Sequence, residues 1–416
     1  MAPKAGDSES TSSRSLRRRD TPTTGETPAT EATLLEKDAG NKSKAQQTPG
    51  RKSAATPEPA LTKVLSEVPS PPHSSAELRS NAETESRTVS SEFPITIRSP
   101  QFQAQVFQPR NIVINSEKRT EEVHEHFQTE KPSDGATFSY TSLEGLEAAG
   151  VFLSLTDDNV ARIVDEYDFM RSTMLCDEEY ATFARETFFL RQRRLKSYPI
   201  DRKWRAERVF HLVCSPEPLS SWQAPPLYPA TVPTDGYKWD IHPDCAYWLS
   251  LTGFNSRYRS ELQQAVFVHR DWITCPYLTV EFKKHNQSGA QALTQALTAA
   301  ALALFNRFEL KRKALEAEAR NWSEGDAEMT RHYVITFFEA RYTIWILLAD
   351  VKDATWTGCT LGRLYTSACV SSASVRALES WINEIHRWGL QKHAGDCHGD
   401  MMRILEANGT DVSMMK

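Results

Sequence analysis

The chain predicts a mixed α/β fold in which one central sheet is flanked by helices, and three observations lead to this class. Apolar residues recur at helical spacing in several long segments. Short runs of β-branched and aromatic residues stand between those segments. The order is helices, then strands, a long helix after the third strand, more strands and a closing helix, which is typical of one sheet covered by helices.

The first 92 residues are predicted to be a disordered tail. They contain no Phe, Trp, Tyr or Cys, whereas all 10 Trp, 12 Tyr and 18 Phe of the chain follow them. A segment rich in Ser, Thr, Pro, Ala, Glu and Lys buries too little apolar surface to offset the entropy of ordering. The remaining stretch of about 320 residues is long enough for one large domain with a sizeable core.

Domain boundaries follow from these changes in residue composition. We expect a disordered Ser/Pro/Thr-rich tail at 1–92, a poorly defined extension at 93–150, a folded domain at 151–400 and a C-terminal tail at 401–416. Within the extension, residues 102–114 alternate weakly and predict an edge strand.

Two helices open the folded domain. Residues 156–174 predict the first, with Thr156 as a cap ahead of two aspartates. Residues 176–196 predict the second, with acidic residues in the first turn and basic residues in the last, an arrangement that suits the helix dipole.

Strands follow a Pro-rich loop at residues 215–233. β-branched and aromatic residues indicate strands within 237–251, at 266–268 and at 277–282. An Ala- and Leu-rich pattern then predicts a long helix. This helix is expected at 288–319. Two strands within 333–348, a further strand at 361–370 and an amphipathic helix at 371–390 complete the domain.

Charge and cysteine content limit the function classes. Residues 1–92 hold 13 basic and 13 acidic residues, so the net charge of −5 belongs to the rest of the chain. Dedicated duplex-binding domains are usually basic, so this balance argues against broad nonspecific DNA binding while allowing a local basic groove. The seven cysteines include no CxxC pair, and no secretory signal opens the chain.

An intracellular location is therefore expected. Neither of the two most apolar stretches is both long and uncharged enough to span a bilayer, so no membrane segment is expected. Arg17, Arg18 and Arg19, and a looser cluster from Lys42 to Lys52, are candidate nuclear import signals; ordinary charge in a disordered tail explains them equally well.

Two short segments carry the candidate chemistry. Pro243-Asp244 begins a strand-like run, and Glu281-Phe282-Lys283 ends another. Period two along a strand places Glu281 and Lys283 on one face and Phe282 on the other, toward a core. Charges on so apolar a strand call for a reason.

Phosphodiester hydrolysis supplies such a reason. Mg²⁺ prefers oxygen ligands and keeps several waters, so one or two carboxylates suffice to bind it. Asp244 and Glu281 are candidates to share Mg²⁺ or Mn²⁺, with the carbonyl of Phe282 as a third ligand. Lys283 is the candidate to orient or deprotonate the attacking water, or to stabilise the pentavalent phosphorus.

With these residues, the chain resembles the PD-(D/E)XK nuclease superfamily. Pro243-Asp244 matches "PD" and Glu281-Phe282-Lys283 matches "(D/E)XK", over about residues 150–395. The resemblance implies a restriction-endonuclease-like core that runs helix, three strands, helix, strand, with the active pair on the second and third strands. It also implies nucleic acid as the partner and a metal-dependent nuclease activity.

Several alternatives stay open. Asp240 competes with Asp244 as the first carboxylate, and accessory roles are open for Gln291 and Gln295 on the following helix and for Glu179 on the preceding one. Each of these residues is also explained as an ordinary surface or turn residue. The alternative to a nuclease is a catalytically inactive module of the same fold that binds nucleic acid or protein.

DNA or RNA as substrate, and pairing into a homodimer, are not decided by the sequence. Residues 191–208 gather basic side chains around Trp204. They are candidates to grip phosphates, although a solvated helix end and loop explains them as well.

Overall fold

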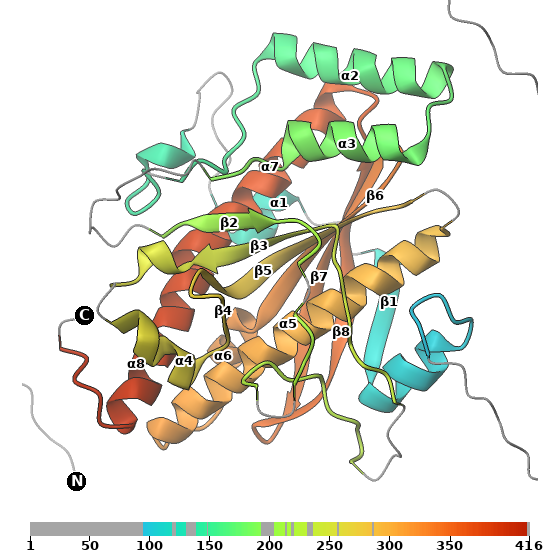
Figure 1. Cartoon of the computed structure of the whole chain (residues 1–416). Coiled ribbons are helices and arrows are strands. Elements are labelled where there is room, and N and C mark those ends of the chain that lie inside the picture. Colours follow the sequence, from blue (N-terminus) through green and yellow to red (C-terminus); the bar gives the residue numbers. More distant parts are fainter. Residues whose placement is uncertain are drawn as a thin grey trace, which may run out of the picture. The chain divides into compact units, whose positions relative to one another are not determined.

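A central sheet of eight strands confirms the predicted mixed α/β class (Figure 1). The structure is a computed structural model that describes residues 95–118, 122–129, 139–147, 149–192, 204–212, 214–217, 220–230, 236–255, 258–284 and 287–413. These residues all belong to one compact unit, Arg87–Lys416. The tail predicted at residues 1–92, with its basic clusters, lies outside the described residues.

The sheet is mixed. Its strands follow the order β1-β8-β7-β6-β5-β3-β2, and the short β4 pairs with β5 beside this path. β5 runs parallel to β6, and β1 runs parallel to β8, whereas the other neighbours are antiparallel. The strands are β1 (Ile112–Lys118), β2 (Ala206–Val209), β3 (Cys245–Ser250), β4 (Val268–His269), β5 (Ile273–Phe282), β6 (Arg331–Phe338), β7 (Arg341–Lys352) and β8 (Thr355–Ala368).

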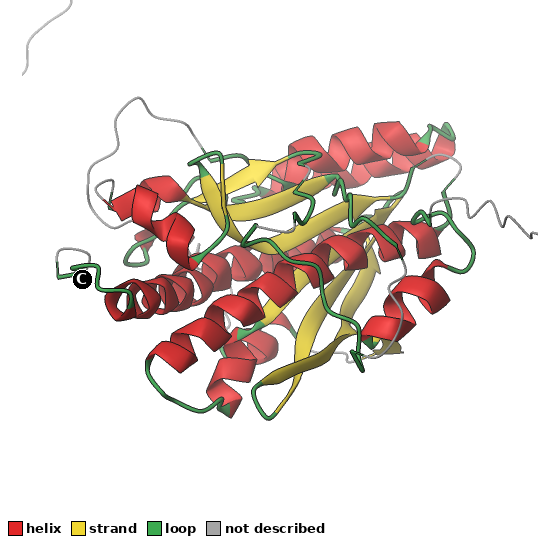
Figure 2. Cartoon of the chain, turned by 60° about the horizontal axis from the view of Figure 1, so that its bottom comes forward, coloured by secondary structure: helices red, strands yellow, loops and turns green. Residues whose placement is uncertain are grey.

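Helices cover both faces of this sheet (Figure 2). The long α5 crosses one face and packs on β5, β6, β7 and β8, whereas α7 lies on the opposite face, behind the strands in the view of Figure 1. The α-helices are α1 (Val123–Phe127), α2 (Asp157–Ser172), α3 (Asp177–Phe188), α4 (Arg259–Ala265), α5 (Gly289–Ala317), α6 (Glu324–Met329), α7 (Ser372–Trp388) and α8 (Ala394–Ala407).

Two apolar cores result, one on each face. The α5 core is built largely from alanines, which let the helix approach the strands closely; Ala296, Ala300 and Ala301 have no exposed surface. The opposite core joins α2, α3, α7 and α8 to β3, β5 and β6. Trp381 and Ile385, which the helical period of residues 371–390 places on the apolar face, are buried there.

Helix starts confirm the cap predicted at Thr156. Its side chain accepts from the Asn159 N–H and Asn159 answers with its own side chain, which forms a capping box ahead of α2. Ser288 and Gln291 form the same motif at the start of α5.

Element boundaries depart from prediction in several places. The second helix ends at Phe188 rather than continuing toward residue 196, and only Cys245–Ser250 of the stretch 237–251 forms a strand. Residues 103–110 are helical turns, and the edge strand follows them at Ile112–Lys118. That strand makes the 93–150 extension part of the sheet. β8 begins at Thr355, earlier than the predicted 361.

The C-terminal tail predicted from residue 401 is wrong in its first part. α8 continues to Ala407, and Met401 and Leu405 are fully buried in the core. Arg307 and Lys311 of α5 form ion pairs with Asp400 of α8 at 2.7 and 2.9 Å. The C-terminal helix is therefore an integral layer of the domain.

Candidate functional site

Asp244 and Glu281 meet at the point where β3 begins and β5 ends. The antiparallel register pairs Cys245 with Val280, so one further step sets Asp244 opposite Glu281. Both side chains are fully buried. The structure thus brings together the two carboxylates that the sequence singled out.

Each of the two acidic side chains accepts a hydrogen bond from the backbone of the opposite strand end. The Asp244 N–H donates to Glu281 Oε2 at 3.2 Å, and the Phe282 N–H donates to Asp244 Oδ2 at 3.0 Å. The side chains thereby continue the ladder beyond the last backbone pair. This arrangement fixes both carboxyl groups within a few ångströms of the strand ends.

The faces of β5 follow the predicted period up to its last residue. The Phe282 ring packs against Phe337 in the core opposite α5, with ring centroids 5.4 Å apart. Thr279, two residues before Glu281, lines a cavity with Ala299 and Leu302 of α5. Glu281 therefore faces α5, and the following Phe282 faces the other core, as predicted.

Lys283 departs from this pattern. Its ammonium lies 3.0 Å from Asp177 Oδ2 at the first turn of α3 and 4.4 Å from the Phe338 ring centroid. α3 belongs to the core opposite α5, so the ammonium is on the wrong side to serve Glu281. The expectation that Lys283 accompanies the carboxylates is wrong because the strand ends at Phe282 and period two stops with it.

Lys284 takes the place expected for Lys283. Its Nζ lies 2.7 Å from Asp244 Oδ1, and its side chain is 43% exposed. His211 approaches the same carboxylate, with Nδ1 at 3.7 Å from Oδ1. A buried carboxylate pair is thus joined to solvent through an ammonium and an imidazole.

The electrostatics of the pair distinguish Glu281. Burial, reinforced by the nearby charge of Asp244, raises the pKa of the Glu281 carboxyl well above its usual range. Glu281 Oε1 is buried and has no hydrogen-bond donor among the described residues. An orphaned acceptor oxygen of this kind is costly unless a proton or a cation satisfies it.

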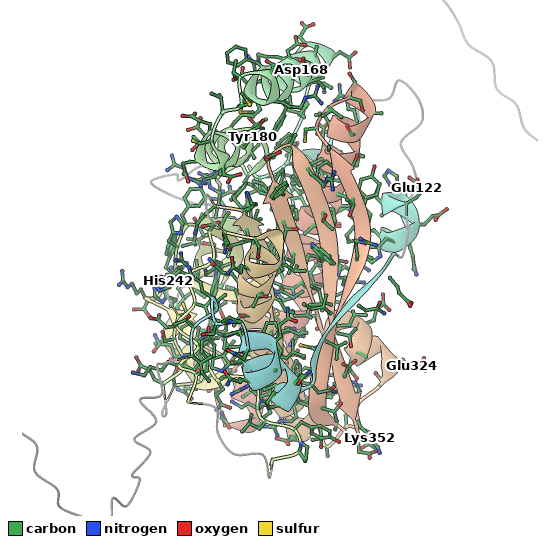
Figure 3. The ribbon with its side chains drawn as sticks, turned by 90° about the vertical axis from the view of Figure 1, so that its right-hand side faces the viewer. Glu122, Asp168, Tyr180, His242, Glu324 and Lys352 are labelled. Carbon is green, nitrogen blue, oxygen red and sulfur yellow. The ribbon has the colours of Figure 1, made fainter. Side chains whose placement is uncertain are left out.

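The other candidates are distributed around the pair. Gln295 of α5 donates to the His242 carbonyl at 3.2 Å and so supports the loop that leads into Asp244. Gln291 is engaged in the α5 capping box. Asp240 is exposed; it accepts a hydrogen bond from the Ser215 hydroxyl and lies 3.4 Å from His242 Nε2. Asp244, rather than Asp240, is therefore the carboxylate that meets Glu281. His242 lies at the surface in Figure 3.

Glu179 does not reach the site, since it is exposed in the first turn of α3. Trp204 packs edge-on against Phe254 and His398, with centroids 5.0 and 5.5 Å away. Residues 193–203 of the predicted basic segment lie outside the described residues. Of that segment, Arg208 is the residue placed near the carboxylates: its charge and that of Arg185 act on the thiol of Cys245, beside Asp244.

A magnesium ion fits the residues present. Two carboxylates face one another; Asp244 Oδ1 is approached by the Lys284 ammonium, and Glu281 Oε1 has no hydrogen-bond donor among the described residues. Mg²⁺ takes one or two carboxylates and keeps waters, so the pair offers ligands of the kind that this ion prefers, and the Phe282 carbonyl stays the expected third ligand. In the described part of the chain no group of three or more His, Cys, Asp or Glu side chains converges as a metal site. Softer, fully protein-ligated metals such as structural zinc therefore find no match there.

Comparison with known proteins adds no relative. No family model, curated protein or solved structure matches this chain. Among the described residues, no helix is long and apolar enough to cross a membrane. The function must therefore be argued from the site itself.

Proposed function

We propose that the folded domain is a metal-dependent nuclease that hydrolyses nucleic-acid phosphodiester bonds at Asp244 and Glu281. The observation that carries the proposal is the facing of these two buried carboxylates across β3 and β5, with the Lys284 ammonium 2.7 Å from Asp244. Two carboxylates and a lysine at adjacent strand ends match the residue types of the PD-(D/E)XK resemblance. With the short α4, β4 and α6 set aside as insertions, the order α3, β2, β3, β5, α5, β6 also matches its helix, three strands, helix, strand.

Each residue has a distinct part in this proposal. Bound Mg²⁺ or Mn²⁺ would be held by Asp244 and Glu281, and would supply charge neutralisation and an activated water. Lys284 orients that water and offsets the negative charge that builds on phosphorus. A water oxygen bonds to phosphorus, one ester P–O bond breaks, and the proton released from water balances the proton taken up by the leaving oxygen.

Cleavage of labelled single- and double-stranded DNA and RNA with Mg²⁺ or Mn²⁺ tests the proposal. We expect the wild type to cut, and Asp244→Asn and Glu281→Gln to lose about 10²-fold or more of that activity, the usual scale for removing one electrostatic group. Glu316→Gln is the matched control, because that glutamate is 63% exposed on α5. A folded wild type that cuts no substrate with either ion would end the nuclease proposal.

The two lysines give a sharper comparison. Lys284→Met should abolish cleavage, whereas Lys283→Met should lose only its pair with Asp177 and keep most of the activity. The reverse result would restore the role of Lys283 and show that the strand end rearranges when substrate binds.

A second function is favoured by one observation. Both carboxylates are fully buried, and the Lys284 ammonium already neutralises Asp244. A site closed in this way suits a non-cutting module that binds nucleic acid or protein. Nucleic-acid binding without cleavage, and without any change in stability on adding Mg²⁺ or Mn²⁺, would favour that alternative.

A further inference from the structure

An exposed aromatic ring lies on the α3 side of the sheet, one residue before the imidazole that approaches Asp244. β2 is the edge strand beneath α3 (Figure 1), and it ends at Val209. Phe210 follows with 37% of its surface exposed. The next residue, His211, donates its N–H to the Pro243 carbonyl at 3.1 Å, one residue before Asp244. This contact anchors the end of β2 beside the loop that leads into Asp244.

The anchor is a strained one. His211 has a φ of 46°, in the left-handed region that costs a non-glycine residue about 1–2 kcal/mol. Strain of this kind persists where the surroundings fix the backbone, and it concentrates at functional sites. Here it turns the imidazole toward Asp244 and leaves the Phe210 ring at the surface.

Two guanidinium groups stand beside that ring. Arg208 lies 4.4 Å and Arg185 lies 5.6 Å from the Phe210 ring centroid. Arg208 is fixed by donating to the carbonyls of Arg185 and Phe189 near the end of α3. The Nε atoms of both arginines are buried and have no hydrogen-bond partner among the described residues. We name Arg185, Arg208, Phe210 and His211 the Phe210 ledge.

The surroundings of the ledge are acidic. Residues 157–179, which form α2 and the first turn of α3, hold eight acidic and two basic residues. Figure 3 shows Asp168 of α2 and Tyr180 of α3 together at one end of the molecule. Glu178 lies 3.6 Å from Arg185, so this acidic surface begins at the ledge itself. A wide duplex laid across the site would approach these carboxylates, which repel its phosphates. A narrower single strand can lie on the ledge without approaching them.

We propose that the Phe210 ledge is a nucleotide-binding subsite that makes unpaired, single-stranded nucleic acid the substrate of this site. The ring of Phe210 stacks on one exposed base on the α3 side of the sheet, Arg185 contacts the adjoining phosphate there, and His211, the next residue along the chain, guides the nucleic-acid strand toward Asp244. Stacking requires a free base face, which a paired duplex lacks away from its ends. This inference rests on the proposed function and names its substrate class.

Binding measured without cleavage tests the subsite separately from hydrolysis. The probes are a fluorescein-labelled oligothymidylate and a labelled hairpin duplex of equal nucleotide content, followed by anisotropy in EDTA. We expect the wild type to prefer the single strand. Phe210→Ala should weaken single-strand binding about tenfold or more, the scale of one base–aromatic stack, and Phe210→Trp should retain it.

Matched variants separate stacking from folding and from charge. Phe169→Ala on α2 removes another exposed phenylalanine, 56% exposed, and should leave binding unchanged. Arg185→Gln should weaken binding to single strands and flatten its salt dependence. Equal thermal unfolding of Phe210→Ala and wild type confirms that the fold persists.

The outcomes distinguish this subsite from the nuclease proposal. If Phe210→Ala loses single-strand binding while no protein cuts, the subsite stands and hydrolysis fails. If the wild type cuts but Phe210→Ala binds and cuts single strands as before, the subsite is refuted and the nuclease stands. A wild type that binds the duplex more tightly than the single strand also refutes it.

Discussion

Replacing Glu281 by glutamine should stabilise the metal-free protein at neutral pH, although most substitutions of buried residues destabilise. The buried Glu281 carboxyl has one oxygen without a donor, and leaving a buried polar atom unsatisfied costs about 1–3 kcal/mol. Glutamine keeps an acceptor for the Asp244 N–H and carries no charge. We therefore expect the free energy of unfolding to rise by about 1–3 kcal/mol.

The pH dependence gives the prediction its sign. In the unfolded chain Glu281 ionises near its ordinary pKa of 4.5, whereas the folded protein retains the proton to higher pH. The folded state binds more protons in this window, so the stability of the wild type falls as pH rises through it. The glutamine variant lacks this loss. The stabilities of the two proteins should be similar near the low end of this pH window and should diverge as pH rises.

Urea unfolding followed by tryptophan fluorescence in EDTA, at a series of pH values, measures this difference. Glu316→Gln, on the exposed face of α5, should stay within about 0.5 kcal/mol of wild type at every pH. A Glu281→Gln protein that is less stable than wild type at neutral pH, or a difference that does not change with pH, would refute the reasoning. Adding Mg²⁺ at 100-fold above its Kd should then stabilise the wild type alone by about 2.7 kcal/mol.

Three further changes test the fold. Asp400→Ala leaves Arg307 and Lys311 buried beside Asp396 with one carboxylate fewer, and should cost about 3–5 kcal/mol in urea unfolding; a loss under 1 kcal/mol would mean that Asp396 suffices. Trp381→Ala should cost about 3–5 kcal/mol because its indole is 1% exposed in the core, and unchanged stability would contradict that packing. Ser288→Ala removes the α5 cap and should cost about 1 kcal/mol, an effect that Ser288→Asp should restore.

Long periodic elements were predictable because their side-chain pattern is set by one face. The helix at 371–390 was found from its apolar spacing, and the structure buries that face. The strand within 237–251 was overextended, because aromatic residues such as Trp239 are buried from a loop as well as from a strand. Composition reports burial, and only pairing decides whether a buried segment is a strand.

The C-terminal helix was missed for a definite reason. Gly389 is the kind of residue that ends a helix, yet it is required because a Cβ there would lie 2.5 Å from the Tyr277 ring. The chain passes this contact in a π-helical turn and continues into α8. Long-range contact, which the local sequence does not report, determined the identity of the residue.

The sequence predicted the two acidic residues of the site, Asp244 and Glu281, but not the basic residue beside them, Lys284. Asp244 and Glu281 stand in strand-like segments, and antiparallel pairing brings them together. The choice between Lys283 and Lys284 depends on where β5 ends, and a shift of one residue reverses the face. His211 and Arg185 come from separate elements, and no local motif marks them.

The reciprocal hydrogen bonds between the two strands also bear on how such sites can be read across evolution. Asp244 and Glu281 each bind the backbone of the opposite strand, so losing either would loosen the pairing of β3 and β5 whether or not the protein cuts anything. A descendant under selection for stability alone would therefore still keep a hydrogen-bond acceptor at both positions, and glutamine supplies one at position 281 as well as glutamate does. The Lys284 side chain does not hold the strands together in this way, since it forms an ion pair with Asp244 from a position that is 43% exposed. In a lineage of this fold, we therefore expect position 284 to vary more freely than positions 244 and 281, whose side chains hold β3 and β5 together.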